Sequence, residues 1–387
     1  MPFGIEGRSA AELIEEALTL YARTEPLVRA FAWLDEERAR RLAQDADAQP
    51  PEKRERLRLW GVPVGIKDIV DTAGIPTECG SALFAGRVPE RSAPLMQRLE
   101  ADGALMVGKT VTTECAYFHP GPTRNPWDVR RTSGGSSMGS AAAVAMGVIP
   151  AAIGSQTNGS VIRPAAYCGV VGFKPTHGRI PTEGVMAFAP TLDTIGTFTR
   201  SAADAARLAA VMTAEPVHTW WDPSDVLDGG GDGVLRVRLA AVRTAEWSHA
   251  EPAMRGRFEA DLAALADAGA EITDESLPDG MDECVPIHRT IMQYESKETL
   301  GALIEEHPER ASDTLREYVR GGAAIARAEY EAALKERDRL IAAFAAWARP
   351  FDAIVTPPTT GEAPTPETTG DPRFCTRWTL VGAPAIT

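Results

Sequence analysis

The sequence of 387 residues predicts an α/β fold. Two observations lead to this prediction: apolar, strand-like runs alternate with helical segments, and a glycine repeatedly separates a helix from the next strand. Residues 60–74 have the composition of a buried strand that ends in a turn, and residues 94–110 follow the order helix, glycine turn, strand. The same order recurs at residues 252–273, so the alternation continues past the middle of the chain.

Local signals mark the other elements in chain order. Ser9 and Glu12 match a capping box at the start of a first helix, and residues 36–48 predict a second, charged helix. Ser201 is the expected N-cap of a helix that follows it. Further on, the sequence predicts a strand over 234–242, a long amphipathic helix over 324–350 and a strand over 351–359.

The chain is expected to form one domain over residues 1–387. A turn-rich, glycine-rich stretch makes residues 215–231 the best candidate for an internal boundary. It separates an N-terminal part, 1–214, from a more helical C-terminal part, 232–387.

Composition excludes several classes of function. The formal charge of −14 argues against nucleic acid or an anionic membrane as the main partner. The five cysteines are scattered, without a CxxC pair or a histidine cluster, so we expect no metal site, no cofactor and no disulfide framework. This cysteine usage and the absence of a signal peptide or a long apolar run predict a cytoplasmic protein.

The most informative segment is residues 125–174, which is dense in Gly, Ser and Ala. Small residues allow close backbone approach, and hydroxyls beside bare N–H groups suit an activated serine with an oxyanion hole. This segment contains no histidine, but a buried lysine can act as the base. Lys67 follows the apolar residues 62–66, which favours a lowered pKa; the alternative is an ion pair with Asp68 or Asp71.

Four ordered segments, GVPVGIKD, GGSSMGSAAAV, SQTNGSVIRPAAYCGVVGFKPT and LDTIGTFTRSAADAA, resemble the amidase signature family of serine hydrolases. Within that family, VIRP and GDPRFCTRWTLVGAPA are most similar to the small bacterial malonamidase-like amidases. The resemblance implies the amidase-signature fold, a central mixed, twisted β-sheet covered on both faces by α-helices.

The resemblance also implies the roles of the site residues. Ser160 becomes the nucleophile, Ser136 the bridging serine after a cis peptide bond, and Lys67 the base. The oxyanion hole would consist of the backbone N–H groups of Thr157, Asn158, Gly159 and Ser160. Gly135 would give the backbone freedom beside the substrate. Without the resemblance, Ser136 and Ser160 would be interpreted as turn or helix-cap hydroxyls. Ser137 and Ser140 would then be equally good candidates for a catalytic serine.

We therefore expect an amidase that hydrolyses the C–N bond of a small linear, non-peptide amide with water, through an acyl-enzyme. Arg163 suits a substrate carboxylate, as in malonamate, because a guanidinium binds carboxylates bidentately; pairing with a structural carboxylate is the alternative. Other open readings are a hydrolase of neutral or aryl amides or carbamates, a protein similar to a subunit of a glutamine-dependent amidotransferase, and a non-catalytic scaffold. The aromatic and sulfur side chains expected to line an apolar cleft are Phe118, Trp127, Met186, Phe188 and Trp378.

The C-terminal segment VGAPAIT differs from the family pattern. Chains of the family continue beyond such a segment into further strands and a helix, so we expect the given sequence to stop short of the usual end. A second copy of the chain, in a homodimer, is a candidate partner for strand edges left uncovered.

Overall fold

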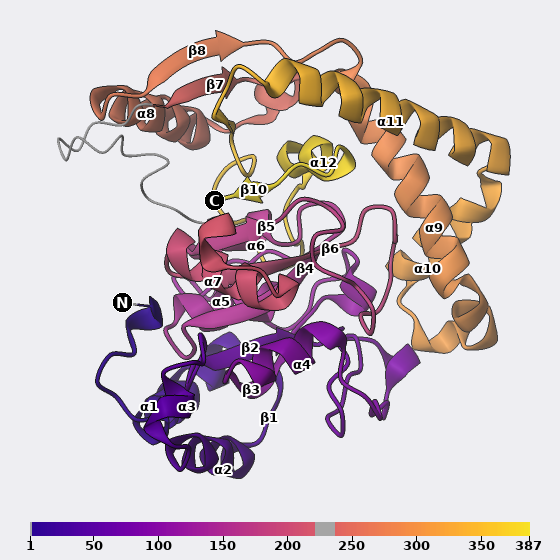
Figure 1. Ribbon diagram of the computed structural model, residues 1–387. Helices are drawn as coiled ribbons and strands as arrows, with labels where there is room; N and C mark the ends of the chain where they lie inside the picture. Colours follow the sequence, from indigo (N-terminus) through magenta and orange to yellow (C-terminus); the bar gives the residue numbers. More distant parts are fainter. Residues whose placement is uncertain (1, 221–236) are drawn as a thin grey trace.

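The computed structural model describes residues 2–220 and 237–387. At its centre lies a seven-stranded sheet with the strand order β1-β3-β2-β4-β6-β5-β10 (Figure 1). β2 is parallel to β3 and β4, whereas the other neighbouring pairs are antiparallel, which confirms the predicted mixed sheet. The strands are β1 (Phe31–Leu34), β2 (Pro63–Lys67), β3 (Leu105–Thr110), β4 (Ala151–Gln156), β5 (Val171–Lys174), β6 (Thr194–Thr199) and β10 (Ala385–Ile386).

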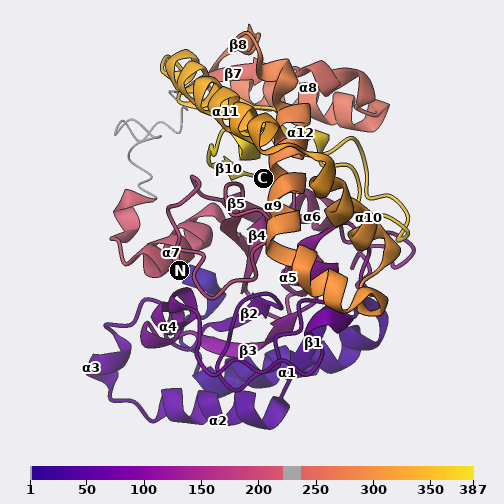
Figure 2. The ribbon, with the colours of Figure 1, turned by 90° about the vertical axis from the view of Figure 1, so that its right-hand side faces the viewer.

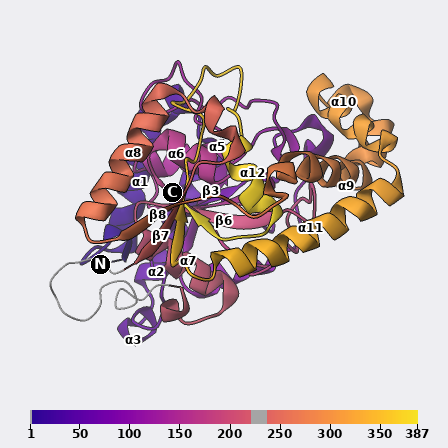
Figure 3. The same ribbon diagram turned by 90° about the horizontal axis from the view of Figure 1, so that it is seen from above.

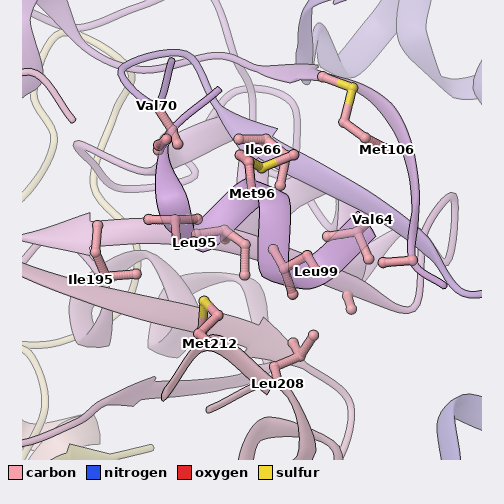
Figure 4. Packing of buried hydrophobic residues seen from close by; sticks show 14 of the residues in the cluster. Val64, Ile66, Val70, Leu95, Met96, Leu99, Met106, Ile195, Leu208 and Met212 are labelled. Carbon is pink, nitrogen blue, oxygen red and sulfur yellow. The ribbon is translucent and has the colours of Figure 1, made fainter. Parts of the chain in front are cut away.

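Helices cover both faces of this sheet because side chains alternate along its strands. On β3, Met106 belongs to one hydrophobic cluster, while Leu105 and Val107 belong to the other. Figure 4 shows the first cluster, where β2 packs against two helices. That face carries α4 (Pro94–Ala101) and α7 (Ala202–Thr213), and the other carries α1 (Ala10–Val28), α2 (Glu36–Asp47), α5 (Met138–Ala145) and α6 (Ile162–Cys168).

Local signals predict several helix starts correctly. Ser9 and Glu12 form the predicted capping box, and the Ser201 side chain accepts a hydrogen bond from the Asp204 backbone N–H at the start of α7. The sequence does not predict β1, which lies between two helices. This four-residue strand is defined by its antiparallel pairing with β3, a contact distant in sequence.

A smaller parallel sheet with the order β8-β7-β9 lies at the top of Figure 1. Its strands are β7 (Arg238–Val242), β8 (Glu271–Glu275) and β9 (Ala353–Val355), and α8 (Pro252–Asp267) packs beside them. The helix–glycine–strand pattern predicted for residues 252–273 corresponds to α8 and β8. In Figure 3, α8 and α11 (Arg327–Ala348) flank this sheet.

Further helices connect the smaller sheet with the larger one. α9 (Cys284–Glu306), α10 (Asp313–Gly321), α11 and α12 (Arg373–Leu380) share a hydrophobic cluster with residues of the loop before β6, among them Phe188 and Leu192. Figure 2 shows α9 crossing one side of the larger sheet. As a result, side chains of α9 and α12 reach the loops at the ends of β4 and β6.

Part of the expected internal boundary falls outside the described residues. The structure describes residues 215–220, with a short 3-10 helix at Val217–Thr219, but not residues 221–231. Residues 234–236 of the predicted strand are outside as well, and the described part of that strand is β7. Among the helices of the described residues, none combines the length and the apolar character needed to cross a membrane.

Candidate active site

Lys67 ends β2 and meets two serine hydroxyls. Its Nζ lies 2.7 Å from Ser136 Oγ and 2.8 Å from Ser155 Oγ. β2 and β4 are parallel neighbours, so their carboxyl ends, which carry Lys67 and Ser155, lie at the same edge of the sheet. Ser136 comes from the loop before α5. The sequence predicts the first contact but not the second.

Burial sets the protonation of Lys67. The side chain is fully buried, and this desolvation lowers its pKa to about 7, against a smaller opposing effect of the Asp193 carboxylate. The alternative of an ion pair with its neighbours is wrong. Asp68 lies 3.5 Å from Lys109 Nζ, and Asp71 pairs with an arginine, Arg87, at 2.7 Å. Near pH 7, Lys67 is therefore poised between its charged and neutral forms.

Ser136 follows a cis peptide bond, as the family resemblance implies. The Gly135 carbonyl that precedes it accepts a hydrogen bond of 2.8 Å from Arg163 Nη2. A Cβ on Gly135 would lie 2.8 Å from Thr369 Cγ2, so a larger residue would clash there. Gly135 thus permits close packing next to the bridging serine.

Ser137, the neighbour of Ser136, bonds to β4 and does not cap its own helix. It occupies the N-cap of α5, but its side chain makes no capping hydrogen bond. Instead, its Oγ donates to Ser155 O at 3.1 Å and accepts from Ser155 N at 3.2 Å. Ser137 therefore fixes the backbone of β4 at the residue that contacts Lys67.

Ser160 lies in the loop between β4 and α6. Ser136 and Ser160 line the same small cavity of about 10 Å³, which is room for about one water molecule. Within the described part of the chain, no hydrogen bond joins these two hydroxyls, and the four backbone N–H groups of the expected oxyanion hole, those of Thr157, Asn158, Gly159 and Ser160, have no protein acceptor. These N–H groups are the available donors beside the nucleophile position.

Two polar side chains, Gln156 and Asn158, hold this loop. Gln156 Oε1 accepts hydrogen bonds from Val161 N at 2.8 Å and Ile162 N at 3.0 Å, which closes the loop around Ser160. Asn158 Oδ1 accepts a hydrogen bond of 2.7 Å from Thr376 Oγ1 on α12. Both polar side chains therefore fix backbone conformation.

Asp193 supports the start of the same loop. Its carboxylate accepts from Thr157 Oγ1 at 2.5 Å and from the backbone N–H groups of Phe188 and Ala189 at 2.9 and 3.1 Å. Burial raises its pKa to about 6 despite these hydrogen bonds. Asp193 therefore anchors this loop, and its carboxylate also adds a negative charge near Lys67.

Arg163 is buried without a carboxylate partner among the described residues. Its Nη2 donates to Gly135 O and, at 3.3 Å, to Thr369 Oγ1, while Nε and Nη1 have no partner there. The guanidinium carbon lies 5.4 Å from the centre of the Phe118 ring, and the side chain lines the small cavity with Ser136 and Ser160. The alternative of a structural ion pair is therefore not met.

A larger cavity of about 530 Å³ adjoins the small one, since Tyr117, Phe118, Asn158 and Met292 line both. Of the five residues expected to line the cleft, only Phe118 lines either cavity. Trp127 is 72% exposed and lies elsewhere, and Trp378 is buried against Phe344. Met186 and Phe188 line a separate small cavity next to Asp193. The walls of the larger cavity that sequence reasoning missed include His288, Arg289 and Tyr318.

Two supporting residues were missed because the sequence carries no local signal for them. Ser155 is an ordinary serine in a strand, and its contact with Lys67 depends on the pairing of β2 with β4. His288 lies on α9, and its Nε2 is 2.8 Å from the Thr157 carbonyl oxygen. Its position in a helix far along the chain gives no indication of that contact.

Comparisons with known proteins identify similar sequences and folds. The family described as Amidase matches residues 12–385. A subunit of the glutamyl-tRNA(Gln) amidotransferase from Anaeromyxobacter sp. (strain K) is 38% identical over 288 residues, an alignment that covers 70% of this chain and 57% of that protein. The chain thus spans less than two thirds of the length of this relative.

Two crystal structures are similar over nearly the whole chain. The crystal structure of an amidase superimposes with a TM-score of 0.85 at 29% sequence identity. The aligned region covers 98% of this chain and 88% of the chain of that amidase. The corresponding glutamyl-tRNA(Gln) amidotransferase subunit from Thermotoga maritima has a TM-score of 0.79 at 28% identity, covering 97% and 84%.

Proposed function

Because the chain belongs to the amidase family, we propose that it hydrolyses the C–N bond of an amide through an acyl-enzyme. Ser160 Oγ attacks the carbonyl carbon, its proton passes to Ser136 Oγ, and the proton of Ser136 passes to neutral Lys67. The reverse transfer protonates the leaving nitrogen as the C–N bond breaks. Water then attacks the acyl-enzyme by the same relay, which releases the acid and restores Ser160.

The observation that carries this proposal is the environment of Lys67. A fully buried lysine with a pKa of about 7 makes its side-chain hydrogen bonds to two serine hydroxyls, one of which shares a cavity with Ser160. A neutral amine at this position can accept a proton near pH 7. The N–H groups of residues 157–160, which have no acceptor among the residues that the structure describes, supply donors for the negative charge that develops on the carbonyl oxygen.

For the substrate, we propose an amide that carries a carboxylate. The Arg163 guanidinium is buried and has no ion pair among the described residues, and its Nε and Nη1 have no partner there. Such a group favours binding of a small anion beside the two serines. A substrate carboxylate bound to the Arg163 guanidinium would fix the acyl group beside the serines. The rest of the substrate would extend into the 530 Å³ cavity. The class of substrate is then a linear amide of a short dicarboxylic acid, such as malonamate.

A second candidate function is supply of ammonia within an amidotransferase. The similarity to glutamyl-tRNA(Gln) amidotransferase subunits favours it. In that case glutamine would be the amide that is cleaved, and ammonia release would depend on a partner subunit. The two candidates share the chemistry at Ser160 and differ in the acceptor of the ammonia.

The test is ammonia or amine release from a panel of malonamate, glutamine, propionamide, an anilide and a carbamate. Wild type is compared with Arg163→Met and Arg163→Lys, and Ser160→Ala reports any contaminating activity. A loss confined to malonamate in Arg163→Met, with partial retention in Arg163→Lys, supports the carboxylate contact. An equal loss on propionamide contradicts it, and cleavage of glutamine alone favours the amidotransferase.

A further inference from the structure

Hydrogen bonds to the backbone carbonyls of residues 157–159 hold the peptide planes of the proposed oxyanion hole. In a trans peptide, the carbonyl of one residue and the N–H of the next belong to one rigid plane and point in opposite directions. The structure records a cis bond only before Ser136 among the residues it describes, so the peptides of this loop are trans. Holding a carbonyl on the outside of the loop therefore aims the next N–H inward.

Each carbonyl of this loop has its own donor. His288 Nε2 lies 2.8 Å from Thr157 O, and Thr379 Oγ1 lies 2.6 Å from Asn158 O. The backbone N–H of Arg163 donates to Gly159 O at 3.0 Å. These three bonds fix the planes that carry the N–H groups of Asn158, Gly159 and Ser160, the groups left without protein acceptors.

The chemistry of His288 allows only one direction for its bond. A carbonyl oxygen can only accept, so Nε2 must carry the hydrogen. His288 is buried, and burial lowers its pKa to about 4, which keeps the ring neutral at pH 7 with a single N–H. That single N–H is committed to Thr157.

His288 also contacts the space where a substrate would lie. Its side chain lines the 530 Å³ cavity, and its helix, α9, packs against α10, α11 and α12 in one hydrophobic cluster. Thr157 is restrained a second time through its hydroxyl, which donates to Asp193. The first peptide plane of the loop is therefore held from two sides by side chains of distant elements.

We propose that His288 is a positioning residue of the oxyanion hole: its Nε2–H holds the Thr157 carbonyl and thereby directs the Asn158 N–H at the developing oxyanion. The inference rests on the proposed amidase function. His288 does not exchange protons with the substrate; it acts through the peptide plane. Thr379 has the same role for the next plane, which directs the Gly159 N–H.

The test compares His288→Leu, which removes the donor, with His288→Gln, whose amide nitrogen can take the position of Nε2. Ser296→Ala is the matched control, because Ser296 is a buried polar residue of the same helix whose hydroxyl bonds only within α9. The readouts are kcat and KM for the amide of the substrate panel that wild type cleaves fastest, Ki for phenylboronic acid, which forms a tetrahedral serine adduct, and the melting temperature.

We expect His288→Leu to lower kcat at least about tenfold with KM within about twofold, and to raise the Ki by a similar factor, since the lost alignment affects the tetrahedral state. His288→Gln should recover kcat to within about threefold of wild type, and Ser296→Ala should match wild type. If His288→Leu does not fold, His288→Asn, whose amide is too short, replaces it in the comparison with His288→Gln.

The inference is overturned if His288→Leu folds and retains the kcat and Ki of wild type. It is also overturned if His288→Gln loses as much activity as His288→Leu although its melting temperature is unchanged. Failure of the proposed function looks different. In that case wild type hydrolyses none of the amides of the panel and does not bind the boronic acid, and all variants are alike. Thr379→Val provides an independent check, with the same pattern of lowered kcat and raised Ki expected.

Discussion

Lys67 and Ser155 lie at the carboxyl ends of the neighbouring parallel strands β2 and β4, and Lys67 Nζ is 2.8 Å from Ser155 Oγ. A neutral amine has two N–H donors and one lone pair. When one N–H is given to Ser155, the orientation of the amine is restricted and the lone pair can face Ser136, 2.7 Å away. Ser155 thus orients the base of the proposed relay.

Replacing Ser155 by alanine should lower kcat by about tenfold with little change in KM, because the amine keeps its burial but loses its orientation. Ser155→Thr retains the hydroxyl and should stay close to wild type. Steady-state kinetics of both variants on the same amide check this. Equal kcat for Ser155→Ala and wild type would show that orientation by this hydroxyl is unimportant.

The pH profile follows from the pKa of Lys67, which burial lowers to about 7. The relay needs the neutral amine, and the neutral fraction grows as pH rises through the pKa. We therefore expect kcat/KM to fall below about pH 7 and to reach a plateau above it. A midpoint near the ordinary lysine value of about 10.4 would contradict the assignment of Lys67 as base.

Asp193 should influence this profile. Its negative charge stabilises the ammonium form and so opposes the lowering of the Lys67 pKa. Asp193→Asn removes the charge but keeps an acceptor for the Phe188 and Ala189 N–H groups. The acid limb of kcat/KM should then move to lower pH. A limb that stays in place or moves to higher pH would mean that the two groups are not coupled.

The small residues of the segment 125–174 are explained by close packing of α5. A Cβ on Gly139 would overlap the Ala30 carbonyl oxygen and the Val111 backbone nitrogen. Gly139→Ala should therefore lower the free energy of unfolding by about 2 kcal/mol and displace Ser136 in the loop before the helix. Gly256→Ala, in α8 with open space around it, is the control and should stabilise by about 0.5–1 kcal/mol. Similar unfolding midpoints for both variants in urea would contradict this account.

Sequence reasoning predicts the elements whose signals are local. The capping residues Ser9 and Ser201 fix helix starts, and the apolar run before Lys67 predicts a buried strand with a buried lysine at its end. Because both faces of the sheet are covered, the central strands are buried throughout, as their apolar character indicates.

Long-range contacts explain what the sequence does not predict. β1 depends on pairing with β3, and the contacts of Ser155 and His288 depend on the pairing of strands and the packing of α9. For Trp127 the sequence predicts a cleft contact that the structure does not contain. Its indole N–H donates a hydrogen bond of 2.7 Å to Cys168 O, and its side chain lies on the surface. Such outcomes depend on tertiary structure.

The central claim is that Ser160 is a nucleophile activated by Lys67 through Ser136. Its most direct test is modification by phenylmethylsulfonyl fluoride at pH 8, followed by intact mass and peptide mapping of wild type, Lys67→Ala, Ser136→Ala and Ser160→Ala. We predict a single adduct on Ser160 in wild type, a rate at least about a hundredfold lower in Lys67→Ala and Ser136→Ala, and none in Ser160→Ala. An unmodified Ser160 in folded wild-type protein, or an adduct that forms equally fast without Lys67, would contradict the account.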